Sequence, residues 1–411
     1  MSGRPGVPRW ARWETLGLAA AAFLALWSLA ALMTGQGLPG FDSFYNSYSL
    51  QAEAWLKGRL DLGQDYEWLE LAIRDGKYYV SFPPFPSLVM LPLVLIFGAN
   101  TPDTCVALLF ALLALYHACA IGGRLLPERR GSVVLWVLFL LLGNGYLFLC
   151  LNGWVWFIAQ NLMFALSLAA IHHALAGRGG LSLTCWAAAV GCRPMAVFYA
   201  PVLLWLLLRS ARETDPAFSP REMVRRRWYW VLGPVLLAAF YMGLNQARFG
   251  NPLEFGHSFL PEFNTYGSQF SLSYLWPNLQ TLLRGPYLDP AGRLSFHTRD
   301  AGAAWLLNPL LWTGPAAWIA GLRRRKGGAS LALIPALTLL YILVVLCHRT
   351  LGAWQFGNRY LVDVMPWIWL GVLLHLPEET EPRFTAWNLP LMALGVALQF
   401  LGTVATYNAW I

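Results

Sequence analysis

Asp42 is the carboxylate whose setting in this chain best suits acid–base chemistry. It lies in residues 35–103, a segment that follows the first long apolar run and holds eight of the 21 acidic residues. A carboxylate without a partner is costly in hydrocarbon, so these acids must lie in water or line a wet cavity. A glycine- and proline-rich stretch precedes Asp42, which keeps it close to the membrane surface. Its position fits a general base, or alternatively a cap for a helix starting near Phe44.

Three arginines could bind an anionic group on the same side of the membrane: Arg193, Arg248 and Arg359. Guanidinium groups bind phosphate through bidentate, charge-assisted hydrogen bonds. An arginine at membrane depth, as expected for Arg193, is a functional candidate by default. The alternatives are a structural pair with a loop acid such as Asp363, or, for Arg248, a side chain that simply reaches the interface.

Aromatic side chains are abundant, with 21 Trp and 16 Tyr. Many will anchor the membrane interfaces, and some can serve as stacking platforms for sugar rings. The substrate contacts expected on the outer side are Tyr45, Tyr79, Trp354 and His257.

No metal centre or other cofactor is expected. The histidines have no metal-ligand spacing to one another. Asp61, Asp65 and Glu67 could bind a divalent ion, but their spacing is not that of an EF-hand, so a wet acidic face is the preferred interpretation. The six cysteines include no C-x-x-C pair and mostly sit in apolar runs, where they act as small core residues.

The composition indicates an all-α polytopic integral membrane protein. Hydrophobic residues make up 57% of the 411 positions and charged residues only 12%. Soluble proteins carry about a quarter charged residues, and a bilayer-spanning helix needs about 20 apolar residues. The net charge of +8 comes from basic residues in short loops, which suggests positive-inside anchoring rather than nucleic-acid binding.

We expect about eleven crossings in one transmembrane domain, 1–411, with no separate soluble domain. Two short helices within 182–208 should meet at Cys192-Arg193-Pro194, because proline ends the first half. The other crossings are predicted at 14–34, 103–123, 132–150, 157–176, 229–247, 303–321, 329–347, 361–376 and 385–405.

Charge parity predicts a cytoplasmic N-terminus and two long extracytoplasmic loops. The first, 35–102, should contain an amphipathic helix at Phe44–Gly58 and a jutting helix at 86–98. The second covers 248–301.

Taken together, these segments resemble the GT-C superfamily of membrane glycosyltransferases, such as protein O-mannosyltransferases and lipid A aminoarabinose transferases. The resemblance covers most of the chain, and the order of its motifs makes it specific. The motifs are Gly40-Phe41-Asp42, the YYVSFPP stretch from Tyr78 to Pro84, Arg193-Pro194, the RFGNPL stretch from Arg248, and the WQFGNRYL stretch from Trp354. One departure is the turn Leu151–Trp156, which has no acid where many members of the family carry a second one.

The resemblance implies an inverting transfer of a sugar from a polyprenyl-phosphate donor to an acceptor hydroxyl at the extracytoplasmic face of a membrane, which is the plasma membrane in the family's bacterial members. Asp42 would act as general base, and Arg193, Arg359 and Arg248 would bind the lipid phosphate. The acceptor could be a glycan, a lipid or a protein, and nucleic acid is not an expected partner.

Two other functions are compatible with such a chain. A lipid-linked sugar flippase or transporter would show charges in the middle of several helices and an internal repeat. Few mid-helix charges are expected here apart from Arg193, and the sequence shows no convincing repeat. A glycan ligase or polymerase with a diphosphate-linked donor would share the outer arginines, but Asp42 directly after the first helix favours the monosaccharide transferase.

Overall fold

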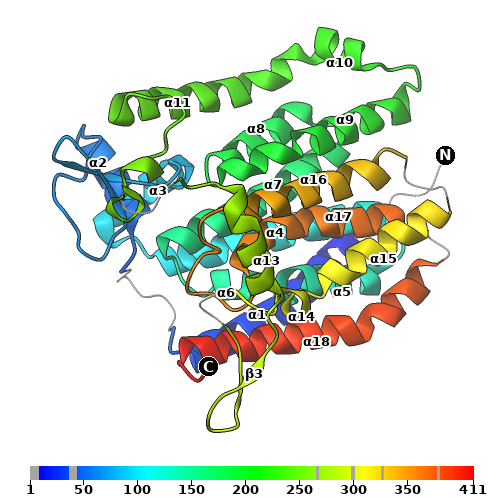
Figure 1. Ribbon diagram of the computed structural model, residues 1–411. Coiled ribbons are helices and arrows are strands. Elements are labelled where there is room, and N and C mark those ends of the chain that lie inside the picture. Colours follow the sequence, from blue (N-terminus) through cyan, green and yellow to red (C-terminus); the bar gives the residue numbers. More distant parts are fainter. Residues whose placement is uncertain (1–8, 37–43, 265–267, 298–300, 325–327, 377–379) are drawn as a thin grey trace. The chain divides into compact units, whose positions relative to one another are not determined.

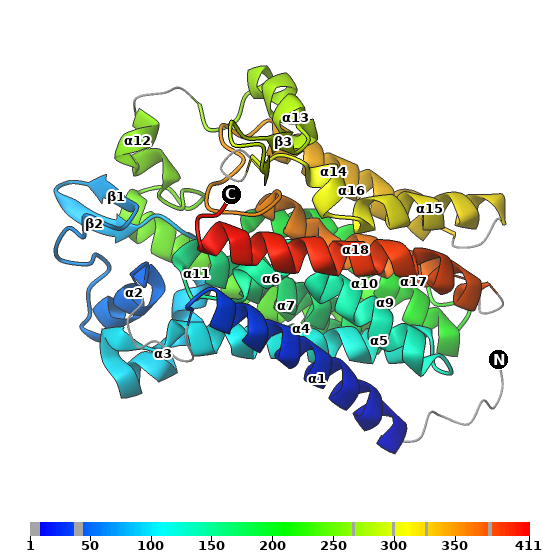
Figure 2. The same cartoon turned by 90° about the horizontal axis from the view of Figure 1, so that it is seen from below.

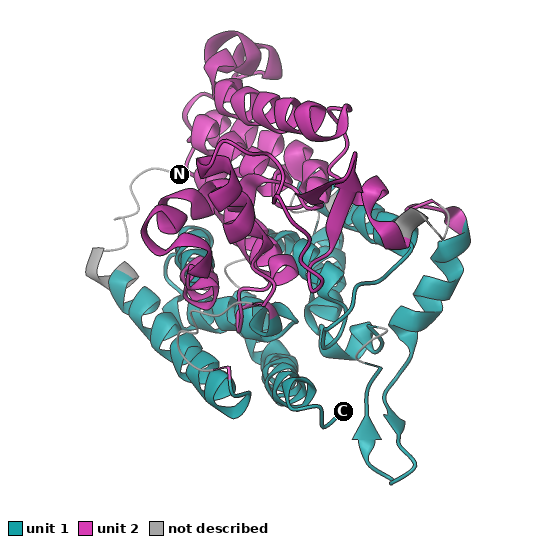
Figure 3. Cartoon of the chain, turned by 90° about the vertical axis from the view of Figure 1, so that its left-hand side faces the viewer, with its two compact units in different colours: residues 1–35, 112–148, 273–411 teal, residues 36–111, 149–272 magenta. Residues whose placement is uncertain are grey.

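The computed structural model describes residues 9–36, 44–264, 268–297, 301–324, 328–376 and 380–411. The chain forms two compact units, coloured in Figure 3. Unit 1 comprises residues 1–35, 112–148 and 273–411, and unit 2 comprises 36–111 and 149–272. Asp42 lies outside the described residues.

Unit 2 holds most of the expected outer loop and a layered set of helices. Its regular elements are α2 (Ser47–Leu56), β1 (Leu71–Arg74), β2 (Lys77–Val80), α3 (Phe85–Phe97), the start of α4 (Asp103–Leu125), α7 (Val155–Leu175), α8 (Gly179–Val190), α9 (Ala200–Thr214), α10 (Pro220–Arg227), α11 (Leu232–Phe249) and α12 (Pro261–Asn264), with short 3₁₀ segments at Gly98–Asn100, Pro194–Tyr199, Trp228–Val231 and His257–Phe259.

The central element of unit 2 is α7, which is apolar all round and buried on nearly every face. Helices α8 and α9 pack against it, and α11 runs along α8 (Figure 1). Its few polar groups have partners: Asn161 Nδ2 donates to the Ala107 carbonyl at 2.7 Å, and Ser182 Oγ of α8 donates to the Ala170 carbonyl at 2.8 Å. Because buried polar groups are costly when unpaired, these bonds fix how the neighbouring segments sit on α7.

The hairpin β1–β2 was not predicted from the sequence. Leu71 pairs with Val80 and Arg74 with Lys77 in an antiparallel register. Asp75 and Gly76, with φ of 52° and 72°, form the turn. Two residues with positive φ are what a two-residue hairpin turn requires, and Asp-Gly is a favoured sequence for it.

Unit 1 contains the two chain ends and the C-terminal helices. Its elements are α1 (Arg9–Met33), the remainder of α4, α5 (Arg130–Leu142), most of α6 (Tyr146–Leu149), α13 (Leu275–Leu283), β3 (Tyr287–Leu288), β4 (Leu294–Ser295), α14 (Ala304–Leu307), α15 (Leu310–Arg323), α16 (Ser330–Leu346), a 3₁₀ turn at Arg359–Val364, α17 (Met365–His375) and α18 (Glu381–Tyr407); a further 3₁₀ turn at Leu272–Tyr274 joins the units in the chain.

Within unit 1, α17 is the buried helix, and α15 and α16 pack against it. Helices α1, α5 and α18 lie side by side (Figure 2). Tryptophan nitrogens link this core, since Trp369 Nε1 donates to the Trp136 carbonyl at 2.9 Å and Trp136 Nε1 donates to Thr385 Oγ1 at 2.9 Å.

The structure confirms the all-α membrane class. Six helical segments among the described residues are long and apolar enough to span a bilayer, and four shorter apolar helices accompany them. Each predicted crossing coincides with a helical segment. The predicted pair within 182–208 is also present, but its second half is longer than expected, because Pro194–Thr214 runs for 21 residues.

Two predicted helices are interrupted. The segment 132–150 divides into α5 and α6, because Asn144 takes over local backbone bonds: its Nδ2 donates to the Leu140 carbonyl, and its Oδ1 accepts from Tyr146 N at 3.1 Å. The segment 303–321 divides into α14 and α15 at Pro309, because the residue before a proline avoids helical geometry.

Candidate active site

The turn at Gly191–Pro194 is where Arg193 meets the first loop. The amide of Phe85, at the start of α3, donates to the Gly191 carbonyl at 3.0 Å. A Cβ on residue 191 would collide with the Tyr241 hydroxyl, so glycine is needed for this close approach. Pro194 then starts a 3₁₀ turn, which leaves Arg193 half-buried at the break between α8 and α9.

The inner face of α2 lies against this turn. Tyr48 and Ala52 belong to the same buried cluster as Cys192 and Ala196. Burial raises the pKa of the Tyr48 phenol well above its ordinary value, Cys192 adds to the rise, and the nearby Arg193 guanidinium acts in the opposite direction. Tyr48 therefore stays protonated and remains a hydrogen-bond donor.

Polar groups continue along this face of α2. Gln51 Oε1 accepts a hydrogen bond from Ser87 Oγ of α3 at 2.8 Å. Ser47 Oγ, Tyr48 Oη and Gln51 Nε2 are buried and have no hydrogen-bond partner among the residues that the structure describes. Of these three buried donors, the Tyr48 hydroxyl lies near the Arg193 guanidinium, and a hydroxyl donor beside a cation suits an anion.

The turn Leu151–Trp156 packs on the start of α2. The Val155 amide donates to the Tyr45 carbonyl at 3.0 Å. The Tyr45 ring contacts both Trp154 and Trp156, at centroid distances of 5.1 and 4.8 Å. Gly153 allows the turn to approach the start of α4, because a Cβ there would collide with Asp103. Although the turn carries no acid, it brings Tyr45 next to two indole rings.

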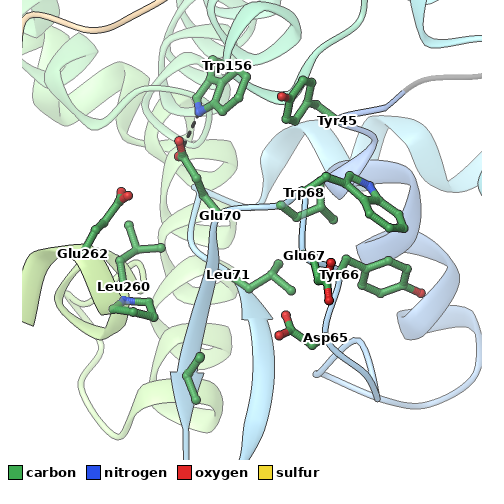
Figure 4. Close-up of a pocket in the computed structure, with 13 residues that line it drawn as sticks. Tyr45, Asp65, Tyr66, Glu67, Trp68, Glu70, Leu71, Trp156, Leu260 and Glu262 are labelled. Carbon is green, nitrogen blue, oxygen red and sulfur yellow. Dashed lines mark hydrogen bonds between the residues drawn. The ribbon is translucent and has the colours of Figure 1, made fainter.

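A cavity of about 460 Å³ opens beside Tyr45 (Figure 4). Trp156 and Glu70 meet at its edge, where Trp156 Nε1 donates to Glu70 Oε2 at 3.0 Å. The cavity is lined by Tyr45, Asp65, Tyr66, Glu67, Trp68, Leu69, Glu70, Leu71, Ile73, Trp156, Leu260, Pro261 and Glu262. Aromatic rings and carboxylates thus dominate its wall. Of the predicted substrate contacts, Tyr45 is the one that lines it.

Arg248 occupies a buried position behind the hairpin. Its side chain is 2% exposed, with Nη1 donating to the Val80 carbonyl at 3.1 Å and Nη2 donating to Asn245 Oδ1 at 2.9 Å. Its guanidinium lies over the Phe249 ring. These contacts join the C-terminal end of α11 to β2.

Tyr79 and His257 also lie around the hairpin. The Tyr79 ring packs edge-on against Phe249 at 5.5 Å, and the His257 ring packs against Phe82 at 5.8 Å. Tyr79 thus belongs to β2 itself, and His257 contacts the segment just after it. The substrate contacts expected of both residues remain predictions.

Arg359 and Trp354 belong to unit 1. Arg359 is 7% exposed and opens the 3₁₀ turn, where its amide donates to Gln355 Oε1 at 2.9 Å and Asn358 Oδ1 caps the Leu361 amide at 3.1 Å. Trp354 is exposed and has a positive φ of 50°. Positive φ is rare for a bulky residue and is found at functional turns.

In the described part of the chain, no group of three His, Cys, Asp or Glu side chains could hold a metal ion.

Comparisons with known proteins give a structural likeness only. Neither a protein-family model nor a curated relative matches this chain. Among solved structures, the chain is similar to ArnT from Cupriavidus metallidurans bound to undecaprenyl phosphate, with a TM-score of 0.47 and 16% identity over 95% of this chain and 76% of that one. The apo structure of the same protein gives a TM-score of 0.45 at the same identity and coverage.

Proposed function

We propose that this protein is an inverting, polyprenyl-phosphate-dependent glycosyltransferase of the GT-C type, working at the extracytoplasmic face of a bacterial plasma membrane. The observation that carries the proposal is that Arg193, at the break between α8 and α9, lies near the buried Tyr48 hydroxyl of α2, which has no hydrogen-bond partner among the described residues. The proposed base, Asp42, lies five positions before the start of α2 in the sequence.

In this proposal Asp42 removes the proton from an acceptor hydroxyl, and the resulting oxygen attacks the anomeric carbon of the donor sugar. The bond between that carbon and the phosphate oxygen breaks, and polyprenyl phosphate leaves from the opposite face. The configuration therefore inverts. Phosphate is a stable leaving group, so its developing charge needs cations more than a proton.

The phosphate would be held by Arg193, with the Tyr48 hydroxyl as a second donor, and the phosphate contact expected of Arg359 in unit 1 stays a prediction. Guanidinium and phenol groups both donate to phosphate oxygens. Arg248 is assigned a structural role instead, because both of its terminal nitrogens already bond within unit 2.

The test is an Asp42→Asn variant in lipid nanodiscs, supplied with a panel of radiolabelled polyprenyl-phosphate sugars. Loss of the base should lower the release of polyprenyl phosphate by about 10²–10⁴-fold while donor binding persists. Asp75→Asn is the matched control, because asparagine tolerates the left-handed φ at that turn. Full activity in Asp42→Asn would overturn the assignment.

A further inference from the structure

The cavity beside Tyr45 has a composition that selects its ligand. Four aromatic residues line it, Tyr45, Tyr66, Trp68 and Trp156, and Trp68 is 48% exposed and so available for stacking. Aromatic faces offer large contact areas to the C–H faces of a sugar ring, and sites for small molecules combine such surfaces with a few polar groups.

The charged groups of the cavity are all of one sign. Asp65, Glu67, Glu70 and Glu262 line it, and its described lining includes no arginine, lysine or histidine. Carboxylates accept hydrogen bonds from sugar hydroxyls and attract amines, but they repel phosphates and uronates. A lipid phosphate would therefore bind elsewhere, as it does in the function proposed above.

The carboxylate of Glu70 is held in place by its neighbours. One of its oxygens, Oε2, accepts from Trp156 Nε1, and its backbone carbonyl accepts from Ser81 Oγ at 3.0 Å. The residue also stands immediately before β1, which is fixed by its pairing with β2. Figure 4 shows the side chain reaching from the base of the hairpin to Trp156 at the edge of the cavity. A fixed acceptor of this kind can orient a hydroxyl or an amine.

We propose that this cavity binds the sugar ring of the acceptor, and that it takes neutral or positively charged sugars and rejects anionic ones. The inference rests on the proposed transferase function. On the predicted topology every lining residue lies in an outer segment, so an acceptor can enter from water while the lipid-linked donor enters from the membrane.

The experiment is saturation-transfer NMR on the full-length protein in nanodiscs, with three methyl glycosides as probes: a neutral glucoside, a cationic glucosaminide and an anionic glucuronide. The first two should receive saturation, and the glucuronide should not. Trp68→Ala should weaken binding of the neutral probe by about three- to tenfold, the range expected for loss of one aromatic contact. Glu70→Gln should reduce the preference for the cationic probe.

Trp228→Ala is the control, because Trp228 is 61% exposed in the same unit and lies outside the cavity lining. Trp68→Phe keeps an aromatic ring and should retain most of the binding. It tests whether any loss in Trp68→Ala comes from the missing ring rather than from misfolding. Equal saturation of the anionic probe, or equal binding by Trp68→Ala and Trp228→Ala, would overturn the proposal.

The same probes separate this inference from the transferase itself. Probe binding that depends on Trp68, together with unimpaired transfer by Asp42→Asn, would overturn the mechanism and leave the sugar site standing. If transfer depends on Asp42 but the acceptor KM is unchanged in Trp68→Ala, the mechanism stands and the sugar site is overturned.

Discussion

Trp156 Nε1 donates a hydrogen bond to the Glu70 carboxylate over 3.0 Å. This bond joins the first turn of α7 to the base of the β1–β2 hairpin, across 86 positions in the sequence. The Trp156 ring also contacts Tyr45. One side chain therefore connects the hairpin, the buried helix and the segment that follows Asp42.

Replacing Trp156 by phenylalanine should loosen the hairpin without unfolding the unit. The ring contact with Tyr45 is retained, but the charge-assisted hydrogen bond, worth about 1.5–3 kcal/mol, is lost. Hydrogen exchange should become faster at the amides of β1 and β2 and stay unchanged in α7. Exchange rates equal to those of the wild type would show that the bond does not hold the hairpin.

Arg193→Lys and Arg248→Lys both keep the positive charge, but the first should affect donor binding and the second the stability of the fold. Lysine cannot reproduce the two bonds of Arg248 to Val80 and Asn245, and an unsatisfied buried group costs about 1–3 kcal/mol. Arg248→Lys should therefore lower the unfolding temperature and leave the donor affinity of the folded fraction intact. Arg193→Lys should weaken donor binding with little change in unfolding temperature. Thermal unfolding and polyprenyl-phosphate titration measure the two quantities, and reversed results would exchange the roles assigned here.

Gly191→Ala should distort the turn that carries Arg193. The added methyl would overlap the Tyr241 hydroxyl and meet Phe85 Cβ at 2.8 Å. We expect a cost of about 1–3 kcal/mol, as for other overpacked sites, and a loss of donor affinity. Gly243→Ala is the matched control, because nothing lies within 4 Å of a Cβ at that helical position. Similar unfolding temperatures for the two variants would contradict the tight packing of the turn.

The β3–β4 loop should become less ordered in acid. The pKa of Asp289 is lowered, first by the backbone N–H of Arg293 and then by that residue's side chain and charge. The stabilisation from a carboxyl with a lowered pKa is complete above its ordinary value and is lost as pH falls through the lowered one. Amide exchange in residues 289–293, corrected for its intrinsic pH dependence, should therefore accelerate below about pH 4. Asp289→Asn should abolish this pH dependence, and a loop whose exchange follows pH equally in both proteins would refute it.

The membrane helices were the most predictable part of the fold. The segments expected at 157–176 and 329–347 correspond closely to α7 and α16, because bilayer thickness fixes the length of an apolar run. The break at Arg193 could also be inferred, because Pro194 ends the preceding helix whatever the tertiary surroundings are. Helix interruptions such as that at Asn144 depend on a single side chain competing for backbone bonds, and hydropathy does not register them.

The surroundings of the site were less predictable. The hairpin has a local signal in Asp75-Gly76, but the charged Arg74 and Lys77 on either side and the short strands leave little apolar alternation to predict it. Arg248 shares its residue type with Arg193, yet its bonds to Val80 and Asn245 arise only in the folded unit. The hydrogen bond between Trp156 and Glu70 is likewise a tertiary contact, and no spacing in the sequence predicts it.

The most direct measurement is a cryo-EM map of the full-length protein with added polyprenyl phosphate. The account predicts lipid density that ends in a phosphate within hydrogen-bond distance of the Arg193 guanidinium and the Tyr48 hydroxyl, with the cavity beside Tyr45 free of lipid. A phosphate bound away from Arg193, or a lipid path continuing to the cytoplasmic side, would contradict the transferase and favour a flippase.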